Sequence, residues 1–134
     1  YYLSVRHRNH LGVMTNGTIS LTAGTASVDL SSVGLWSNIL ILANAPATTV
    51  NGVRALWGGD ANGNGTVSYN GGTNDRDAIL AEVDFDILNE DLTYQSEDIN
   101  FNGITSYNGG SNDRDVLLQL LGFSISAELN EHLP

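Results

Sequence analysis

The sequence predicts an α+β fold, in which an antiparallel β unit is followed by a duplicated loop–helix segment and a final strand. Apolar and polar residues alternate through much of residues 1–58. Between residues 59 and 122, a segment rich in Asp, Asn and Gly occurs twice, each time followed by apolar residues at helical spacing. Alternation returns after this segment. We therefore divide the chain into a β unit (1–58), a duplicated unit (59–122) and a C-terminal strand with its tail (123–134).

The β unit is expected to form part of a β-sandwich. Its predicted strands share an alternating or continuously apolar pattern and are separated by turn residues such as Asn16-Gly17. The predicted strands are residues 1–8, 18–22, 26–30, 38–43 and 53–57. Short strands separated by turn signals are typical of antiparallel sheets. The last of them leads directly into the duplicated unit.

The duplicated segment has the spacing of a calcium-binding loop. Its copies read Asp60-Ala61-Asn62-Gly63-Asn64-Gly65-Thr66 and Asp98-Ile99-Asn100-Phe101-Asn102-Gly103-Ile104. Oxygen side chains at positions 1, 3 and 5 of such a loop converge on one point, glycine at position 6 makes the sharp turn, and the carbonyl of position 7 is the next ligand. The donors are hard oxygens, with no Cys or His in either copy. We therefore expect two Ca²⁺ ions, one in each copy.

The residue that closes each loop is less direct to assign, because an insertion follows Ser68 in the first copy. An ordinary loop closes with an acid at position 12, three residues after the helix N-cap. Asn74 and Asp77 have the spacing of an N-cap and an N3 acid, so Asp77 is the predicted closing ligand and Asp75 is the alternative. With the same reasoning for the second copy, the predicted ligands are Asp60, Asn62, Asn64, Thr66, Asp75, Asp77, Asp98, Asn100, Asn102, Ile104, Asp113 and Asp115.

At these residues the chain resembles a dockerin, the paired calcium-loop module of secreted bacterial proteins. The resemblance covers about residues 57–122 and is interrupted by the inserted Tyr-Asn-Gly-Gly segments. The chain is also similar to a C-terminal region of large secreted surface proteins of Bacteroidetes-type bacteria, through an Arg-His-Arg-Asn-His-Leu-Gly-Val-Met strand, a Leu-Trp-x-Gly-Asp motif and the repeated Asn-Asp-Arg-Asp. The matching residues are 6–14, 56–60, 74–77 and 112–115. This second resemblance implies an extracellular accessory region without catalysis.

Composition narrows the choice of partner and compartment. The formal net charge is −10 and the chain contains no lysine, so no basic patch is expected to neutralise nucleic-acid phosphates. No apolar run has the length of a membrane span. Cysteine is absent, and metal loops are another way to stabilise a small extracellular domain. We therefore expect a secreted or cell-surface bacterial protein that neither binds nucleic acid nor spans a membrane.

Other conspicuous residues are given structural roles. His7 and His10 are three apart, so on one strand their side chains are expected to diverge. Tyr69 and its counterpart Tyr107 lie in the insertions, where packing is favoured over stacking on a glycan. Arg76 is expected to bridge the acids beside it that do not bind calcium.

The sequence thus predicts a non-enzymatic, calcium-stabilised extracellular structural protein. We expect either an adhesin stalk or a subunit of a surface fibre whose copies join head to tail, with residues 123–129 added as a strand to the neighbouring copy. Pairing of this strand within its own chain is the alternative. Other functions consistent with the pattern are a dockerin-like module that docks on another extracellular protein, and a carbohydrate-binding accessory domain using Tyr69 and Tyr107. No grouping of nucleophile, base and oxyanion donor predicts an enzyme.

Overall fold

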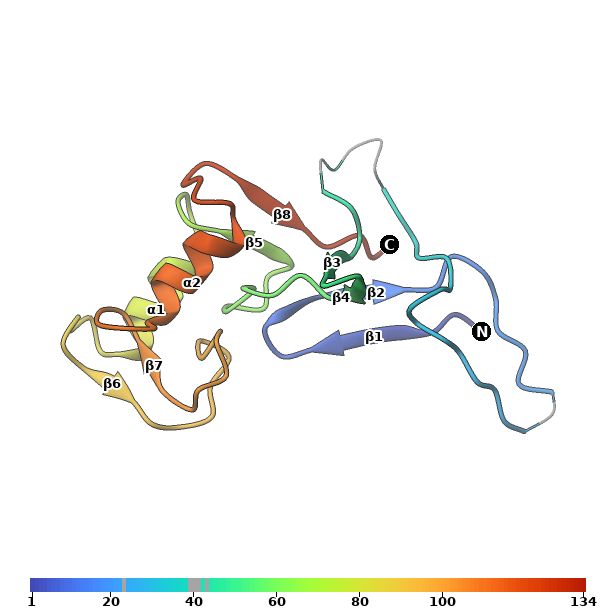
Figure 1. Ribbon diagram of the computed structural model, residues 1–134, viewed down its shortest axis with the longest axis horizontal. Helices are drawn as coiled ribbons and strands as arrows, with labels where there is room; N and C mark the ends of the chain where they lie inside the picture. Colours follow the sequence, from blue (N-terminus) through green and yellow to red (C-terminus); the bar gives the residue numbers. More distant parts are fainter. Residues whose placement is uncertain (23, 39–41, 43) are drawn as a thin grey trace.

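The computed structural model describes residues 1–22, 24–38, 42 and 44–134 (Figure 1). In these residues it has a mixed α+β fold with small antiparallel sheets and two helices. The elements are β1 (Ser4–His7), β2 (His10–Met14), β3 (Thr48–Val50), β4 (Val53–Ala55), β5 (Thr66–Ser68), α1 (Asp75–Glu82), β6 (Glu90–Asp91), β7 (Thr105–Ser106), α2 (Asp113–Leu120) and β8 (Glu128–Asn130).

The N-terminal region forms two hairpins, β1–β2 and β3–β4, instead of the predicted partial sandwich. The chain turns back at Arg8-Asn9, so the strand pattern of the first residues belongs to a hairpin that the sequence reading missed. Residues 18–22 and 26–30 are not strands, although their apolar and polar residues alternate. They make isolated backbone hydrogen bonds, such as Ile19 N–H to Tyr1 O, and do not form a ladder with a neighbouring strand. The strand expected at 38–43 lies mostly outside the described residues.

The duplicated unit is built from two interlocking repeats of strand, helix and strand. The first repeat supplies β5, α1 and β6, and the second supplies β7, α2 and β8. β5 pairs with β8, and β7 pairs with β6, so each loop strand is completed by the last strand of the other repeat. Residues 85–88 form turns that lead into β6. Neither repeat can form its two-stranded ladder alone.

The two helices begin where the capping pattern predicts. Asn74 is the N-cap of α1, and its Oδ1 accepts from the backbone N–H of Asp77 at 2.9 Å. The Asp77 carboxylate accepts from Asn74 Nδ2 at 2.9 Å, which completes the reciprocal cap. Asn112 and Asp115 repeat this geometry at α2, with both distances within 2.9–3.0 Å. The predicted N-caps are therefore confirmed.

The core lies inside the duplicated unit and also holds one residue of the N-terminal hairpin. The buried apolar cluster consists of Leu11, Ala61, Val67, Ile79, Ile99, Leu117 and Leu121. Ile79 and Leu117 occupy equivalent places on the two helices and are fully buried, which contributes about 1.5–3 kcal/mol each. Gly59 sits against this cluster at φ +105°, where an added Cβ would lie 2.8 Å from Val67. The chain therefore needs glycine immediately before the first loop.

The C-terminal strand pairs within its own chain. The strand is Glu128–Asn130, shorter than the expected 123–129, and Leu129 lies opposite Val67 of β5. The tail is also held in place, since His132 is 1 % exposed and its Nδ1 accepts from Asn38 N–H. Intramolecular pairing, the alternative considered above, is the one observed. In the part of the chain that the structure describes, no helix has the length and apolar character needed to cross a membrane.

Candidate metal centres

The first loop is shaped by its own side-chain oxygens. Asp60 accepts through Oδ1 from Asn64 N–H at 3.0 Å and through Oδ2 from Gly65 N–H at 3.1 Å. Asn62 Oδ1 also accepts from Asn64 N–H, at 3.0 Å, and Asn64 Oδ1 accepts from Thr66 N–H at 2.8 Å. These bonds turn the backbone around the predicted ligands and hold Asp60, Asn62 and Asn64 on the inside of one turn.

The second loop repeats this pattern bond for bond. Asp98 accepts from Asn102 N–H at 3.1 Å and from Gly103 N–H at 3.0 Å. Asn100 Oδ1 accepts from Asn102 N–H at 2.9 Å, and Asn102 Oδ1 accepts from Ile104 N–H at 2.8 Å. Two sequences that differ at several positions thus adopt the same local structure.

The carboxylate that reaches the first loop from the helix belongs to Asp75. Asp75 is 0 % exposed, and it accepts from Ser68 N–H at 2.8 Å and from Asn62 N–H at 3.3 Å. Its counterpart Asp113 is also 0 % exposed and accepts from Ser106 N–H at 2.9 Å. The two reserve candidates are therefore the residues that the structure brings to the loops.

The structure does not bring Asp77 and Asp115 to the loops, contrary to the prediction. Their side chains are 56 % and 59 % exposed, and each forms an ion pair of 2.8 Å with the arginine before it. The first helical residue, Asp75, faces the loop and accepts from backbone N–H groups there. The third helical residue, Asp77, is hydrogen-bonded to the N-cap Asn74. Sequence spacing identified the cap correctly, but it did not reveal which side of the helix faces the loop.

The backbone carbonyls of Thr73 and Ser111 also face the loops, and no pattern in the sequence predicts this. Thr73 O accepts from Asn62 Nδ2 at 2.7 Å and from Asn64 Nδ2 at 2.9 Å. Ser111 O accepts from Asn100 Nδ2 at 2.7 Å. Thr73 has φ +56° and Ser111 has φ +58°, a left-handed conformation that is unfavourable for Thr and Ser. The inserted segment thus supplies a carbonyl oxygen close to the ligand side chains.

The position-7 carbonyl of the first loop, that of Thr66, takes no part in pairing with β8. Glu131 N–H donates to Gly65 O, so Gly65 and Glu131 are hydrogen-bonded one residue beyond the β5–β8 ladder and in the same register. Such pairs alternate with non-hydrogen-bonded ones, which places Thr66, the next residue, in a non-bonded pair. The Thr66 carbonyl therefore points away from β8. Ile104, the counterpart of Thr66, donates its N–H to Asn102 Oδ1 in the same way that Thr66 donates to Asn64 Oδ1.

Burial of two carboxylates in each loop is electrostatically unfavourable without a cation. Burial raises the pKa of Asp75 to about 7, and the nearby Asp60 carboxylate adds to the rise. Burial likewise raises the pKa of Asp113, with a contribution from Asp98, and it raises the pKa of Asp60. By contrast, the Arg76 side chain holds the pKa of Asp77 below its usual value. The carboxylates that face the loops are thus the ones that a bound cation would stabilise.

The donor set fits a hard divalent cation. In the described residues, no group of three or more His, Cys, Asp and Glu side chains could hold a metal ion. Each loop instead combines two carboxylates with amide and backbone carbonyl oxygens. Calcium takes six to eight oxygen ligands of these kinds, whereas soft or imidazole-binding metals require other groups. The residues of the first loop that could supply oxygen ligands are Asp60, Asn62, Asn64, Thr66 and Asp75, and the second loop has their counterparts.

His7 and His10 come together, contrary to the expected divergence. They flank the Arg8-Asn9 turn, and their Nδ1 atoms lie 3.1 Å apart. The prediction treated them as members of one strand, whereas they lie on paired strands. Both rings contact Phe101 of the second loop.

Tyr69 and Tyr107 are partly buried against the core, which agrees with the packing role that was favoured for them. The guanidinium carbon of Arg76 lies 5.2 Å from the centre of the Tyr69 ring, and Arg114 lies 5.1 Å from that of Tyr107. Each arginine therefore contacts both the inserted segment and the acid at N3.

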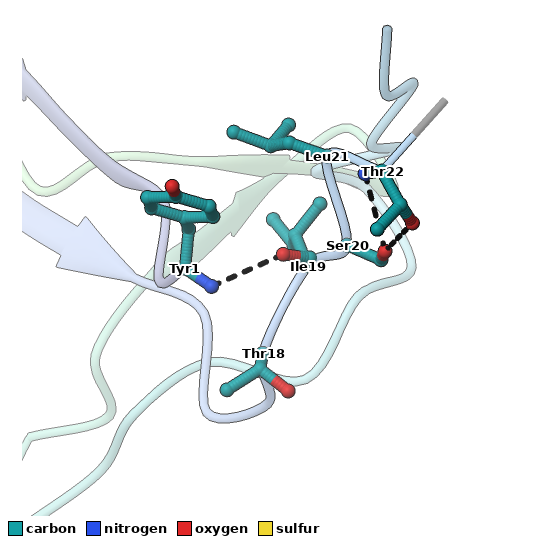
Figure 2. A pocket seen from close by; sticks show the side chains of 6 residues that line it. All are labelled: Tyr1, Thr18, Ile19, Ser20, Leu21 and Thr22. Carbon is teal, nitrogen blue, oxygen red and sulfur yellow. Dashed lines mark hydrogen bonds between the residues drawn. The ribbon is translucent and has the colours of Figure 1, made fainter. Parts of the chain in front are cut away.

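A separate surface hollow of about 580 Å³ lies beside the N-terminal strand. Figure 2 shows Tyr1 facing residues Thr18–Thr22 across it, with the Tyr1 nitrogen donating to Ile19 O at 3.1 Å. Its lining contains no carboxylate, imidazole or guanidinium group. It offers no grouping of residues for catalysis or metal binding and lies apart from the loops.

Comparison with known proteins leaves the candidate sites to be judged on their geometry. No protein-family model matches the chain, and no curated protein or solved structure matches it either.

Proposed function

We propose that this chain is a non-enzymatic, calcium-stabilised structural module of an extracellular bacterial protein, which binds one Ca²⁺ in each of two equivalent loops. The observation that carries the proposal is the burial of Asp75 beside Asp60, repeated by Asp113 beside Asp98. Because each pair of acids is removed from water next to amide and carbonyl oxygens, a divalent cation offsets a repulsion that the chain itself does not neutralise.

The ions have a mechanical role in this proposal. Each loop leads into a strand that is followed by a helix, and the ladder of each repeat is completed by the other repeat. A cation that holds one loop closed therefore stabilises both small sheets. A chain without cysteine gains in this way the cross-links that disulfides supply in many secreted domains. The net charge of −10 also agrees with a protein that is stable only with bound cations.

Calcium titration by calorimetry, together with thermal unfolding in calcium and in excess chelator, tests the proposal. We expect two bound ions for each chain and a marked fall in melting temperature in the chelator, since an ion at 100 times its dissociation constant adds about 2.7 kcal/mol of stability. An unchanged melting temperature after verified metal removal would overturn the calcium assignment. Magnesium serves as the control, because its smaller ion and octahedral preference fit these loops poorly.

A structural role in a fibre or a stalk requires contacts between copies, and exposed apolar side chains favour such contacts. Phe85 and Phe123 are 72 % and 73 % exposed, at equivalent positions after α1 and α2. Both are left-handed, at φ +60° and +62°, which is unfavourable for phenylalanine. Strained, exposed aromatic residues at the same point of both repeats favour contact with another protein surface.

We propose a second copy of this chain as the partner of these residues. The turns that hold Phe85 and Phe123 lead into β6 and β8, which lie at opposite ends of the helix pair (Figure 1). Like contacts at two opposite ends allow a copy to join a neighbour on each side. Head-to-tail addition of β8 is less well supported, because β8 is already paired with β5.

Sedimentation velocity over a range of concentrations in calcium tests this second proposal. We expect self-association of the wild type and a loss of it in the double variant Phe85→Ser/Phe123→Ser. A control variant, Tyr2→Ser, removes an aromatic ring that is 54 % exposed and lies in neither turn. A wild-type chain that stays monomeric at high concentration in calcium contradicts assembly by copies. Loss of association in the control alone would place the contact elsewhere.

A further inference from the structure

Asn9 at the tip of the β1–β2 hairpin contacts the first ligand of both loops. Its carbonyl oxygen accepts from Gly59 N–H at 2.9 Å and from Asp60 N–H at 3.1 Å, at the start of the first loop. Its side-chain amide donates to Ser96 O and to Asp98 O, both at 3.1 Å, at the start of the second loop. Asn9 is 0 % exposed, so water does not compete for these bonds.

Side chains of the second loop and of the residues before it also contact the hairpin tip. Phe101 stacks on His10 with ring centres 5.7 Å apart and 21° between the planes. It occupies the place that Gly63 has in the first loop, and its φ of +60° is unfavourable for phenylalanine. Arg8 adds an ion pair of 3.9 Å with Asp98 and lies 3.4 Å from the centre of the Tyr94 ring. Contact with the hairpin thus compensates for a strained conformation inside a candidate metal loop.

We infer that Asn9 is a positioning residue that couples the two calcium loops, so that an ion in one loop raises the affinity of the other. The inference rests on the proposed calcium binding. An ion in the second loop fixes the Asp98 peptide group and, through it, the Asn9 amide. A fixed Asn9 holds its carbonyl toward Gly59 and Asp60, so the first loop loses less conformational entropy when it binds its own ion. Because coupling is reciprocal, the first ion assists the second equally.

Figure 1 shows how the hairpin is placed for this role. The turn between β1 and β2 points toward the duplicated unit and reaches the two loop segments that precede β5 and β7. The helices and the ladders also join the two repeats, but they are formed by residues that follow the loops in the sequence. Asn9 acts at the first ligand of each loop.

Coupling is measured by calorimetric calcium titration of the full chain and of two variants that each keep one loop. The variant Asn62→Ala/Asn64→Ala leaves the second loop, and Asn100→Ala/Asn102→Ala leaves the first. These substitutions are independent of which acid closes each loop, and they do not touch the hairpin. The product of the two stepwise binding constants of the full chain, divided by the product of the two single-loop constants, is the coupling factor. We expect a factor of about 10, within the usual range for linked sites.

In the Asn9→Ala background, the same measurements are expected to give a coupling factor within about twofold of one, as for independent sites. A merely structural role for Asn9 would weaken both single-loop constants and leave the factor unchanged. Asn44→Ala is the matched control, since the Asn44 side chain makes two bonds of 2.9 Å to the Asn130 backbone and does not bridge the loops. If Asn9→Ala does not fold in calcium, Phe101→Gly replaces it. That variant relieves the strain while removing the ring contact, and we expect a lowered factor.

The outcomes separate this inference from the proposal beneath it. Two ions that bind with a coupling factor near one, or a factor that Asn9→Ala and Phe101→Gly both leave intact, overturn the coupling but leave calcium binding in place. Absence of calcium binding by the wild-type chain overturns the proposed function itself.

Discussion

Replacement of Asp75 by asparagine is expected to stabilise the calcium-free protein and to remove the stabilisation that calcium gives through the first loop. Asp75 is buried beside Asp60, and its pKa is raised to about 7. A rise from 3.8 to about 7 corresponds to about 4 kcal/mol of lost stability at pH 8 in the absence of a cation. Asparagine has no charge, so Asp75→Asn removes this penalty from the calcium-free protein.

The gain is reduced by lost hydrogen bonding. Asp75 accepts from the backbone N–H groups of Ser68 and Asn62 through different oxygens. Asparagine offers one oxygen, so one N–H faces an amide NH₂ group, at a cost of about 1–3 kcal/mol. The calcium-free variant should therefore be more stable than the wild type by about 1–3 kcal/mol at pH 8. In calcium the variant also lacks the contribution of the first ion, about 2.7 kcal/mol when the ion is at 100 times its dissociation constant. This loss offsets the gain, so in calcium the variant should be no more stable than the wild type, or less stable by up to about 2 kcal/mol.

Urea unfolding at pH 8, in calcium and in chelator, measures both effects. Asp77→Asn is the matched control, because it changes an acid of the same helix that is exposed and paired with Arg76. The control should lose about 0.5–1 kcal/mol from its weakened cap in both conditions and keep its response to calcium. The double variant Asp75→Asn/Asp113→Asn should lose the calcium response altogether. If Asp77→Asn loses the response while Asp75→Asn keeps it, Asp77 closes the loop and the placement of Asp75 does not describe the calcium-bound protein.

Three further predictions concern other parts of the molecule. In chelator, the free energy of unfolding should fall as pH rises from about 4 to 7, because the unfolded Asp75 carboxyl ionises near 3.8 while the folded one stays protonated up to about 7; urea titrations at several pH values check this, and a rise over the same range contradicts the shifted pKa. A chain ending at Gly122 should lose cooperative unfolding by calorimetry even in calcium, because β5 loses its partner β8; if it stays fully folded, the last strand is dispensable. Thr73→Gly should raise the free energy of unfolding by about 1 kcal/mol, since it relieves a left-handed conformation at φ +56°, and a clear loss in urea unfolding refutes the strain.

Much of the duplicated unit could be predicted from the sequence, because its signals are local. The Asp-x-Asn-x-Asn-Gly spacing predicts the turn that the backbone makes, and Asn74 with Asp77 predicts the start of α1. The capping bonds and the bonds among the first seven residues of each loop join residues fewer than six positions apart. Their energetics are therefore encoded within each repeat and appear twice.

Tertiary structure decided the features that depend on partners distant in sequence. Asp75 and Asp77 are both acids in the first turn of α1, and only the folded structure shows that Asp75 faces the loop whereas Asp77 pairs with Arg76. The alternation of residues 123–129 could not reveal that β8 pairs with β5, because a strand pattern identifies a face and not a partner. The hairpin turn at Arg8-Asn9 was missed for lack of glycine or a strong turn pair.

The sequence by itself thus determined two oxygen-rich loops, each followed by a capped helix, because these features are stabilised by neighbours along the chain. Tertiary structure alone decided which carboxylates lie together and that Asn9, nearly ninety residues before Asp98, holds the second loop. Burial and long-range hydrogen bonds arise only when separate segments exclude water from one another. The periodicity of the sequence does not show which distant segments pack together.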